Sequence, residues 1–163
     1  MAPAVHQLSV KLYARGVDRV DPDHVIRAFH SWIQTSALDA IGELPIDVTD
    51  YSHVLRGPGV LLIAHGAQIG VDDSDGRWGL AYRRKRDEPG PIGEKLLDAL
   101  GRALAVAHLA QQTAPLAGEL PIGAGELWVR IHTRLLGPST SATYEALRGE
   151  IARALEPLYG APV

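Results

Sequence analysis

Residues 57–83 read GPGVLLIAHGAQIGVDDSDGRWGLAYR, and this stretch decides the fold. Residues 60–64 are an uninterrupted apolar run after a Gly-Pro-Gly reversal, which indicates a strand covered on both faces. The apolar pattern continues to residue 71, and residues 78–83 alternate between large apolar and smaller or charged side chains. Asp75-Gly76 lies between the two runs and is a typical turn dipeptide. The stretch therefore predicts a β-hairpin with its tip at these two residues.

On the N-terminal side of this stretch, the pattern predicts a strand, a helix and a short strand. Residues 7–14 alternate strictly between apolar and polar side chains, which is typical of a half-buried strand. Asp21-Pro22 forms a good N-cap and first helical residue, and apolar residues at helical spacing extend this helix to about Leu38. Residues 46–51 alternate briefly and indicate an edge strand, which we expect to pair antiparallel with residues 60–64.

The C-terminal side predicts a long helix, a strand and a last helix. An apolar stripe indicates a helix over residues 93–112, and residues 113–125 carry Pro and Gly without a period, as a loop does. Residues 126–136 alternate as a strand, whose non-apolar face carries Trp128, Arg130 and His132. A final helix begins near residue 139 or 140 and ends around residues 157–160.

The order of these elements predicts one α+β domain over residues 1–163. Without the short strand at about 46–51, the order is βαββαβ followed by an appended C-terminal helix, which is the order of a ferredoxin-like fold. That fold would leave residues 60–64 at a sheet edge, although they are apolar on both faces. The extra edge strand removes this conflict by covering them, and we expect a mixed, mainly antiparallel sheet.

Composition excludes several classes of protein. Of the 163 residues, 46% are hydrophobic and 21% charged, as in ordinary globular proteins. The net charge of −3 provides no cationic field, so a nucleic-acid partner is not expected. The chain has no cysteine, hence no disulfide and no thiolate ligand. Because the N-terminus lacks a signal-peptide pattern and no apolar run approaches ~20 residues, we expect no membrane segment and a cytoplasmic location.

No short motif identifies a cofactor, and we expect none. Gly57-Pro58-Gly59 opens a strand and lacks a following Lys-Ser/Thr, which excludes a P-loop and a dinucleotide fingerprint. The Asp-rich residues 72–76 partly match a calcium loop. Val71 and Tyr82 occupy its first and last ligand positions, however, so the pattern fails at both ends.

Histidine and aspartate near residues 47–65 offer a catalytic hypothesis. His53, His65 and Asp50, with Asp47 nearby, are residue types that run acid–base steps or hold a divalent metal. A spacing of three places the two aspartates on opposite faces of a strand. If the edge strand pairs as expected, His65 lies across from Ile46 and far from His53. Polar residues that cap a strand and shape a turn explain the segment without any chemistry, so we predict no metal site.

Basic residues offer a binding hypothesis. Arg83 and Arg84 begin the single basic run of the chain, but on a strand their side chains split between two faces. With Trp128, Arg130 and His132 they are candidates for holding an anion. His65-Gly66, which interrupts the apolar run, suggests a β-bulge turning His65 toward neighbours such as Arg84.

These observations favour a non-catalytic or regulatory module. We expect it to form a homo-oligomer, as a dimer, through its sheet or appended helix, and to bind a small anionic ligand or a protein partner. The alternative is a small enzyme, such as a metal-assisted hydrolase, that uses His53, His65 and Asp50. The sequence alone does not decide whether a reaction is catalysed.

Overall fold

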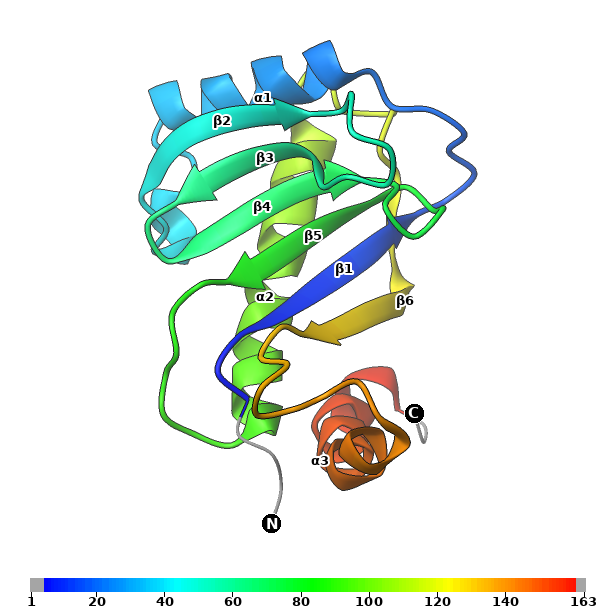
Figure 1. Cartoon of the computed structure of the whole chain (residues 1–163). Helices are drawn as coiled ribbons and strands as arrows, with labels where there is room; N and C mark the ends of the chain where they lie inside the picture. The colour runs from blue at the N-terminus through cyan, green and yellow to red at the C-terminus, as the bar shows by residue number, and fades with distance from the viewer. Residues whose placement is uncertain (1–4, 161–163) are drawn as a thin grey trace.

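The computed structural model describes residues 5–160 and is an α+β structure with six strands, three α-helices and one short 3₁₀ helix. Figure 1 shows them. In chain order they are β1 (Leu8–Ala14), α1 (Pro22–Gln34), the 3₁₀ helix (Asp39–Ile41), β2 (Pro45–Tyr51), β3 (Gly59–Ala64), β4 (Ala67–Asp72), β5 (Gly79–Arg84), α2 (Ile92–Gln112), β6 (Ile122–Ile131) and α3 (Ser141–Tyr159).

The six strands form one sheet in the order β2-β3-β4-β5-β1-β6, and every neighbouring pair is antiparallel. The expectation of a mixed sheet was therefore wrong. Both helical crossovers join strands that run in the same direction, but these strands do not pair. Three strands separate β1 from β2, and β1 lies between β5 and β6.

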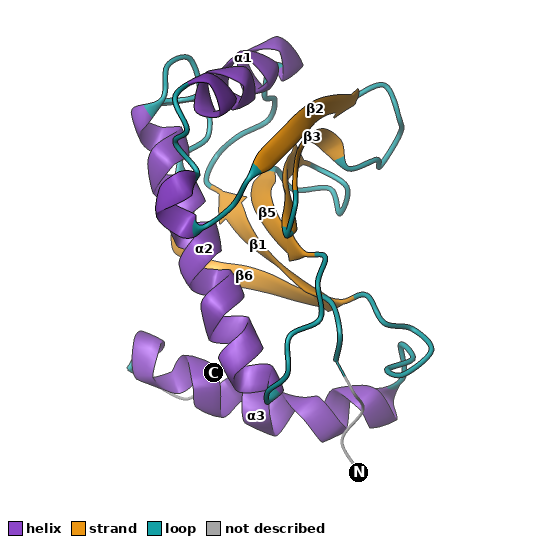
Figure 2. Ribbon diagram, turned by 90° about the vertical axis from the view of Figure 1, so that its left-hand side faces the viewer, coloured by secondary structure: helices purple, strands orange, loops and turns teal. Residues whose placement is uncertain are grey.

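Helices cover only one face of the sheet (Figure 2). Helix α2 packs against β1 and β5, α1 packs against β2 and β3, and α3 packs against α2. Alternation along β1 turns Leu8, Val10 and Leu12 toward this helical layer, where each is at most 1% exposed. The opposite face, which is toward the viewer in Figure 1, has no helix across it. Among residues 5–160, no helix combines the length and apolar character needed to cross a bilayer.

The apolar run of residues 60–71 is two strands instead of one. His65-Gly66 is not a bulge but the tight turn between β3 and β4, which pair antiparallel. Side chains on both strands alternate, so that Leu62 and Ile69 face the helices and are fully buried. The predicted pairing of residues 46–51 with residues 60–64 and the hairpin tip at Asp75-Gly76 are confirmed.

The remaining boundaries differ at three points. Helix α1 ends at Gln34 because the chain enters a tight turn, in which Ser36 has a φ of 52°. Strand β6 begins at Ile122, four residues before its predicted start, and ends at Ile131 instead of residue 136. Gly123 and Gly125 lie in its first half, and without side chains they give no alternation for a sequence reading to detect.

The outer edge of β2 carries features that discourage further strand pairing. It starts at Pro45, which has no backbone N–H, and a register irregularity lies between Pro45 and Asp47. Asp47 and Asp50 are exposed, and Ile46 is 61% exposed. Proline, a bulge and charged side chains are common protections of an edge strand.

Strand β1 lies between β5 and β6 and packs against α2, so its buried leucines test the fold. We expect Leu12→Ala to lower the free energy of unfolding by about 2–5 kcal/mol, because the cavity would lie between the sheet and α2. Leu135→Ala is a matched control, since Leu135 is 98% exposed and its loss is expected to cost at most about 0.5 kcal/mol. Urea denaturation of the two variants measures both values. Equal effects would contradict the assignment of β1 to the core.

Candidate functional site

Polar side chains gather on the uncovered face where β5, β1 and β6 lie side by side. Ser9 of β1 pairs with Arg83 of β5 on one side and with Arg130 of β6 on the other. Residues directly opposite in antiparallel strands point to the same face, with Cβ atoms about 5 Å apart. His132 follows in register and joins this row from the end of β6. We call Ser9, Arg83, Arg130 and His132 the basic cluster.

Contacts within the basic cluster hold its side chains against the sheet. The Ser9 hydroxyl lies 2.9 Å from Nε2 of His132. Arg83 donates from Nη2 to Oε1 of Gln7 at 3.2 Å, while its buried Nε has no hydrogen-bond partner among the described residues. The Arg130 guanidinium lies 4.0 Å from the centre of the Trp128 ring, a cation–π contact.

The positive charge of the basic cluster is not compensated. Four arginines of the described residues form ion pairs with carboxylates, namely Arg77, Arg84, Arg102 and Arg148, but Arg83 and Arg130 are not among them. Burial, together with the nearby positive charges of Arg83, Arg130 and Arg134, lowers the pKa of His132 to about 4. His132 is therefore neutral at pH 7.

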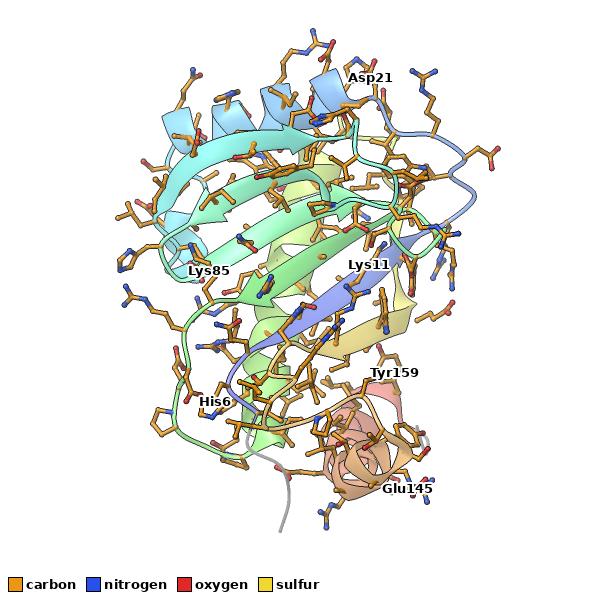
Figure 3. The ribbon with its side chains drawn as sticks, viewed as in Figure 1. His6, Lys11, Asp21, Lys85, Glu145 and Tyr159 are labelled. Carbon is orange, nitrogen blue, oxygen red and sulfur yellow. The ribbon has the colours of Figure 1, made fainter. Side chains whose placement is uncertain are left out.

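The next row of the same face is neutralised internally. Lys11, labelled in Figure 3, is 4% exposed, and its Nζ donates to Asp72 at 2.9 Å and to Asp75 at 2.6 Å. The same Nζ donates to the carbonyl of Arg77. These bonds hold the β4–β5 hairpin tip against β1. Lys11 therefore has a structural role, and its charge is already paired and not available to a ligand.

Arg84 does not belong to the basic cluster. Its side chain faces the helices, where it pairs with Asp98 of α2 and with Glu88. The alternation that separates Arg83 from Arg84 is the one expected from the sequence. Three of the other four predicted ligand residues, Arg83, Arg130 and His132, lie together, and Trp128 lies beneath Arg130.

The residues of the catalytic hypothesis do not converge. His53 follows β2 and His65 follows β3, so the two lie at opposite ends of β3, which at six residues spans about 20 Å. Side-chain and backbone hydrogen bonds from Ser52 hold the pKa of Asp50 below its usual value, as in a turn cap. The Asp47 carboxylate accepts a hydrogen bond from the backbone N–H of Val48. Within residues 5–160, no group of three or more metal-ligating side chains lies close enough to hold a metal ion.

His65 lies elsewhere than the sequence suggested. Pro45 pairs with Ala64, and the backbone N–H of His65 donates to the carbonyl of Leu44, so Ile46 is not its partner. The ring of His65 contacts the Arg86 guanidinium instead of Arg84. The register of Asp47 with Ile63 would by itself place Pro45 opposite His65, and the irregularity after Pro45 moves the partner one residue further, to Leu44.

Sequence reasoning placed Gln7 and Ser9 on the polar face of the first strand but did not name them as candidate site residues. Both lie opposite Leu8 and Val10 in the strict alternation of β1, and that alternation is the only signal for them. Their significance depends on which strands flank β1, and the sequence pattern did not reveal this. A cavity of 640 Å³ at the far end of β1, lined by residues such as Tyr13 and Arg15, was also missed.

Comparison of the chain with protein-family models, with curated proteins and with solved structures found no match. The interpretation of the site therefore depends on its geometry and electrostatics.

The depressed pKa of His132 predicts a pH dependence of stability. Between pH 6.5 and about pH 4 the unfolded chain binds a proton at this residue that the folded chain does not, so acidification through this window lowers the free energy of unfolding. We expect the loss to be smaller in His132→Gln. Urea titrations at pH 7, 5.5 and 4 measure it, and identical profiles for the two proteins would contradict the burial of a neutral imidazole.

The pKa of His132 also tests whether the charge of Arg83 acts on this imidazole. NMR titration of the His132 ring should give a higher pKa in Arg83→Ala than in the unmodified protein, because one neighbouring cation is removed. Arg153→Ala on α3 is the control, since Arg153 is not among the groups that act on His132. An unchanged His132 pKa in Arg83→Ala would show that the two side chains do not interact.

Proposed function

We propose that the chain is a non-catalytic or regulatory module that binds a small oxyanion, a carboxylate or a phosphate group, at the basic cluster. One observation carries this proposal. Two guanidinium groups that have no carboxylate partner among residues 5–160 flank a serine hydroxyl and a neutral histidine on a sheet face that no described helix covers.

The chemistry of these groups suits an oxyanion. Arginine presents a planar fork of N–H donors that matches carboxylate and phosphate oxygens. The buried Nε of Arg83 lacks an acceptor among the described residues, so a shift of this side chain toward an incoming oxygen would satisfy a donor that is otherwise unpaired. The Ser9 hydroxyl is a further donor. An anion would also favour the protonated form of His132, which then donates as well.

The catalytic alternative has less support. It depends on His53 and His65 acting with Asp50, and these residues are distributed over both ends of β3. A small enzyme would need them within one site. The binding hypothesis needs only residues that already lie in one row, which is why we favour it.

Self-association through the appended helix is the second part of the proposal. Only Leu147 and Leu155 of α3 are buried. Tyr144 and Leu158 on this helix are 63% and 59% exposed, and Leu135 in the preceding loop is 98% exposed. Exposed apolar side chains that gather into one patch commonly mark an interface with a partner. A second copy of the chain is the occupant that we propose.

We further propose that the fold extends a ferredoxin-like core, and that the protein is cytoplasmic. Strands β6, β1, β5 and β4 with α2 would correspond to that core, and β2 and β3 would be additions at one edge. In this correspondence the crossover through α1 leads from β1 past the core strands β5 and β4 to the added strands β2 and β3. The lack of cysteine is compatible with a reducing compartment.

Anion binding is tested with inorganic phosphate and acetate, followed by NMR at pH 7.5. We expect saturable shifts of the Arg83, Arg130 and Trp128 signals. In Arg83→Ala the dissociation constant should rise at least about tenfold, because a charge-assisted hydrogen bond contributes about 1.5–3 kcal/mol. The pKa of His132 should rise when phosphate is bound.

Arg153→Ala removes an equal charge from α3 and is expected to bind like the unmodified protein. Equal affinity in Arg83→Ala and Arg153→Ala would exclude the basic cluster as the site. An unchanged His132 pKa at saturating phosphate would exclude contact between the anion and the imidazole.

Light scattering after size exclusion at micromolar concentration tests self-association. We expect a mass of about twice the 17.5 kDa of one chain. The double variant Leu135→Lys with Tyr144→Lys should be monomeric, because it buries charge in the proposed interface. Leu97→Lys on α2, where the side chain is 40% exposed, is the control and should remain dimeric. A strictly monomeric unmodified protein would eliminate this part of the proposal.

A further inference from the structure

A cavity among the described residues lies at the opposite end of β1 from the basic cluster. It has a volume of 640 Å³, which is within the range of about 300–1,000 Å³ typical of small-molecule sites. Its lining residues come from the end of β1, the β4–β5 hairpin turn and the start of β6, and these elements lie at the right of Figure 1. Its principal side chains are those of Tyr13, Arg15, Asp18, Arg77, Trp78 and Glu126.

Arg15 is the cation of this cavity that has no carboxylate partner among residues 5–160. The other cation, Arg77, is neutralised by Glu126 through two hydrogen bonds of 2.6 and 2.9 Å. Arg77 also lies 3.8 Å from the centre of the Tyr13 ring. Arg77 is therefore held in place as part of the cavity lining. The guanidinium N–H groups of Arg15 remain available to a ligand.

The start of β6 is shaped to receive Arg15. Its guanidinium lies against Gly123, where a Cβ atom would come within 2.4 Å of Arg15 Nε. At Gly125 a Cβ atom would lie 3.9 Å from Nη2. The backbone N–H of Arg15 donates to the carbonyl of Pro121 at 3.0 Å, which holds the residue beside this strand. A side chain at position 123 would thus displace Arg15 from the wall.

Trp78 supplies a flat apolar wall. Its indole N–H donates to the backbone carbonyl of Asp18 at 3.2 Å, which fixes the ring between the hairpin and the loop after β1. The exposed carboxylate of Asp18 also lines the cavity, and it forms no ion pair with Arg15. A fixed indole ring beside an unpaired guanidinium suits a planar ligand that carries a carboxylate.

We propose that this cavity is a second binding site, distinct from the basic cluster, for a small aromatic carboxylate. The carboxylate pairs with Arg15 and the ring lies along Trp78. Gly123 is required because it leaves room for the guanidinium. The Asp18 carboxylate repels such a ligand weakly and makes no favourable contact with it.

The experiment titrates the full chain with 2-naphthoate and follows the indole N–H signal of Trp78 by NMR, which Trp78→Phe assigns. We expect a dissociation constant of about 1 mM or tighter, the affinity reached by ligands of this size. Acetate lacks the ring and 2-naphthalenemethanol lacks the charge, so each should bind at least about tenfold more weakly. Equal affinity for all three probes would overturn the proposal.

Variants separate this site from the basic cluster. Arg15→Ala and Gly123→Ala should each weaken naphthoate binding at least about tenfold, the first by removing the charge and the second by displacing it. Asp18→Asn should strengthen binding or leave it unchanged, and weakening would contradict the assigned role. Arg83→Ala should bind naphthoate normally. Loss of naphthoate binding in Arg83→Ala but not in Arg15→Ala would assign the ligand to the basic cluster and overturn this proposal without affecting the first.

Discussion

Helices cover one face of the six-stranded sheet. On the other face, side chains of the sheet itself must cover the apolar groups and pair with the polar ones. Its long side chains lie flat over small residues. A Cβ at Gly79 would come within 2.8 Å of the Lys11 side chain, and one at Gly70 within 2.8 Å of Leu61. Lys11 is neutralised by aspartates of the hairpin. Among the described residues Arg83 and Arg130 have no such partner, so the uncovered face is positively charged where β5, β1 and β6 lie side by side.

Local patterns predicted most of the fold. The alternation of β1, the Asp21 cap of α1 and the Asp75-Gly76 turn are each encoded within a few residues. The turn at His65-Gly66 was not predicted, because a His-Gly pair between two apolar runs is equally compatible with a bulge within one strand. The start of β6 was missed because Gly123 and Gly125 leave no periodicity, and the structure shows that Gly123 gives space to Arg15.

The basic cluster could be predicted only in part. Arg83 stood out in a basic run, and Arg130 with His132 stood out on a polar strand face. Their proximity depends on strand order, since Ser9 brings β5 and β6 together by lying between them. Neither the pairing of β1 with two distant strands nor the unpaired Nε of Arg83 follows from residue spacing. His53 and His65 show the opposite case. They are close in the sequence, but the length of β3 separates them in the structure.

The charged side chains on the outer edge of β2 affect how the protein behaves in acid. Its charge comes from Asp47 and Asp50 alone, so acidification removes the repulsion that keeps two such edges apart, although the hydrogen bonds from Ser52 delay this for Asp50. The exposed Ile46 and an unpaired backbone row then become a template for strands of other molecules. Fibrillar assembly growing from this edge is the expected failure of the native state under acidic storage.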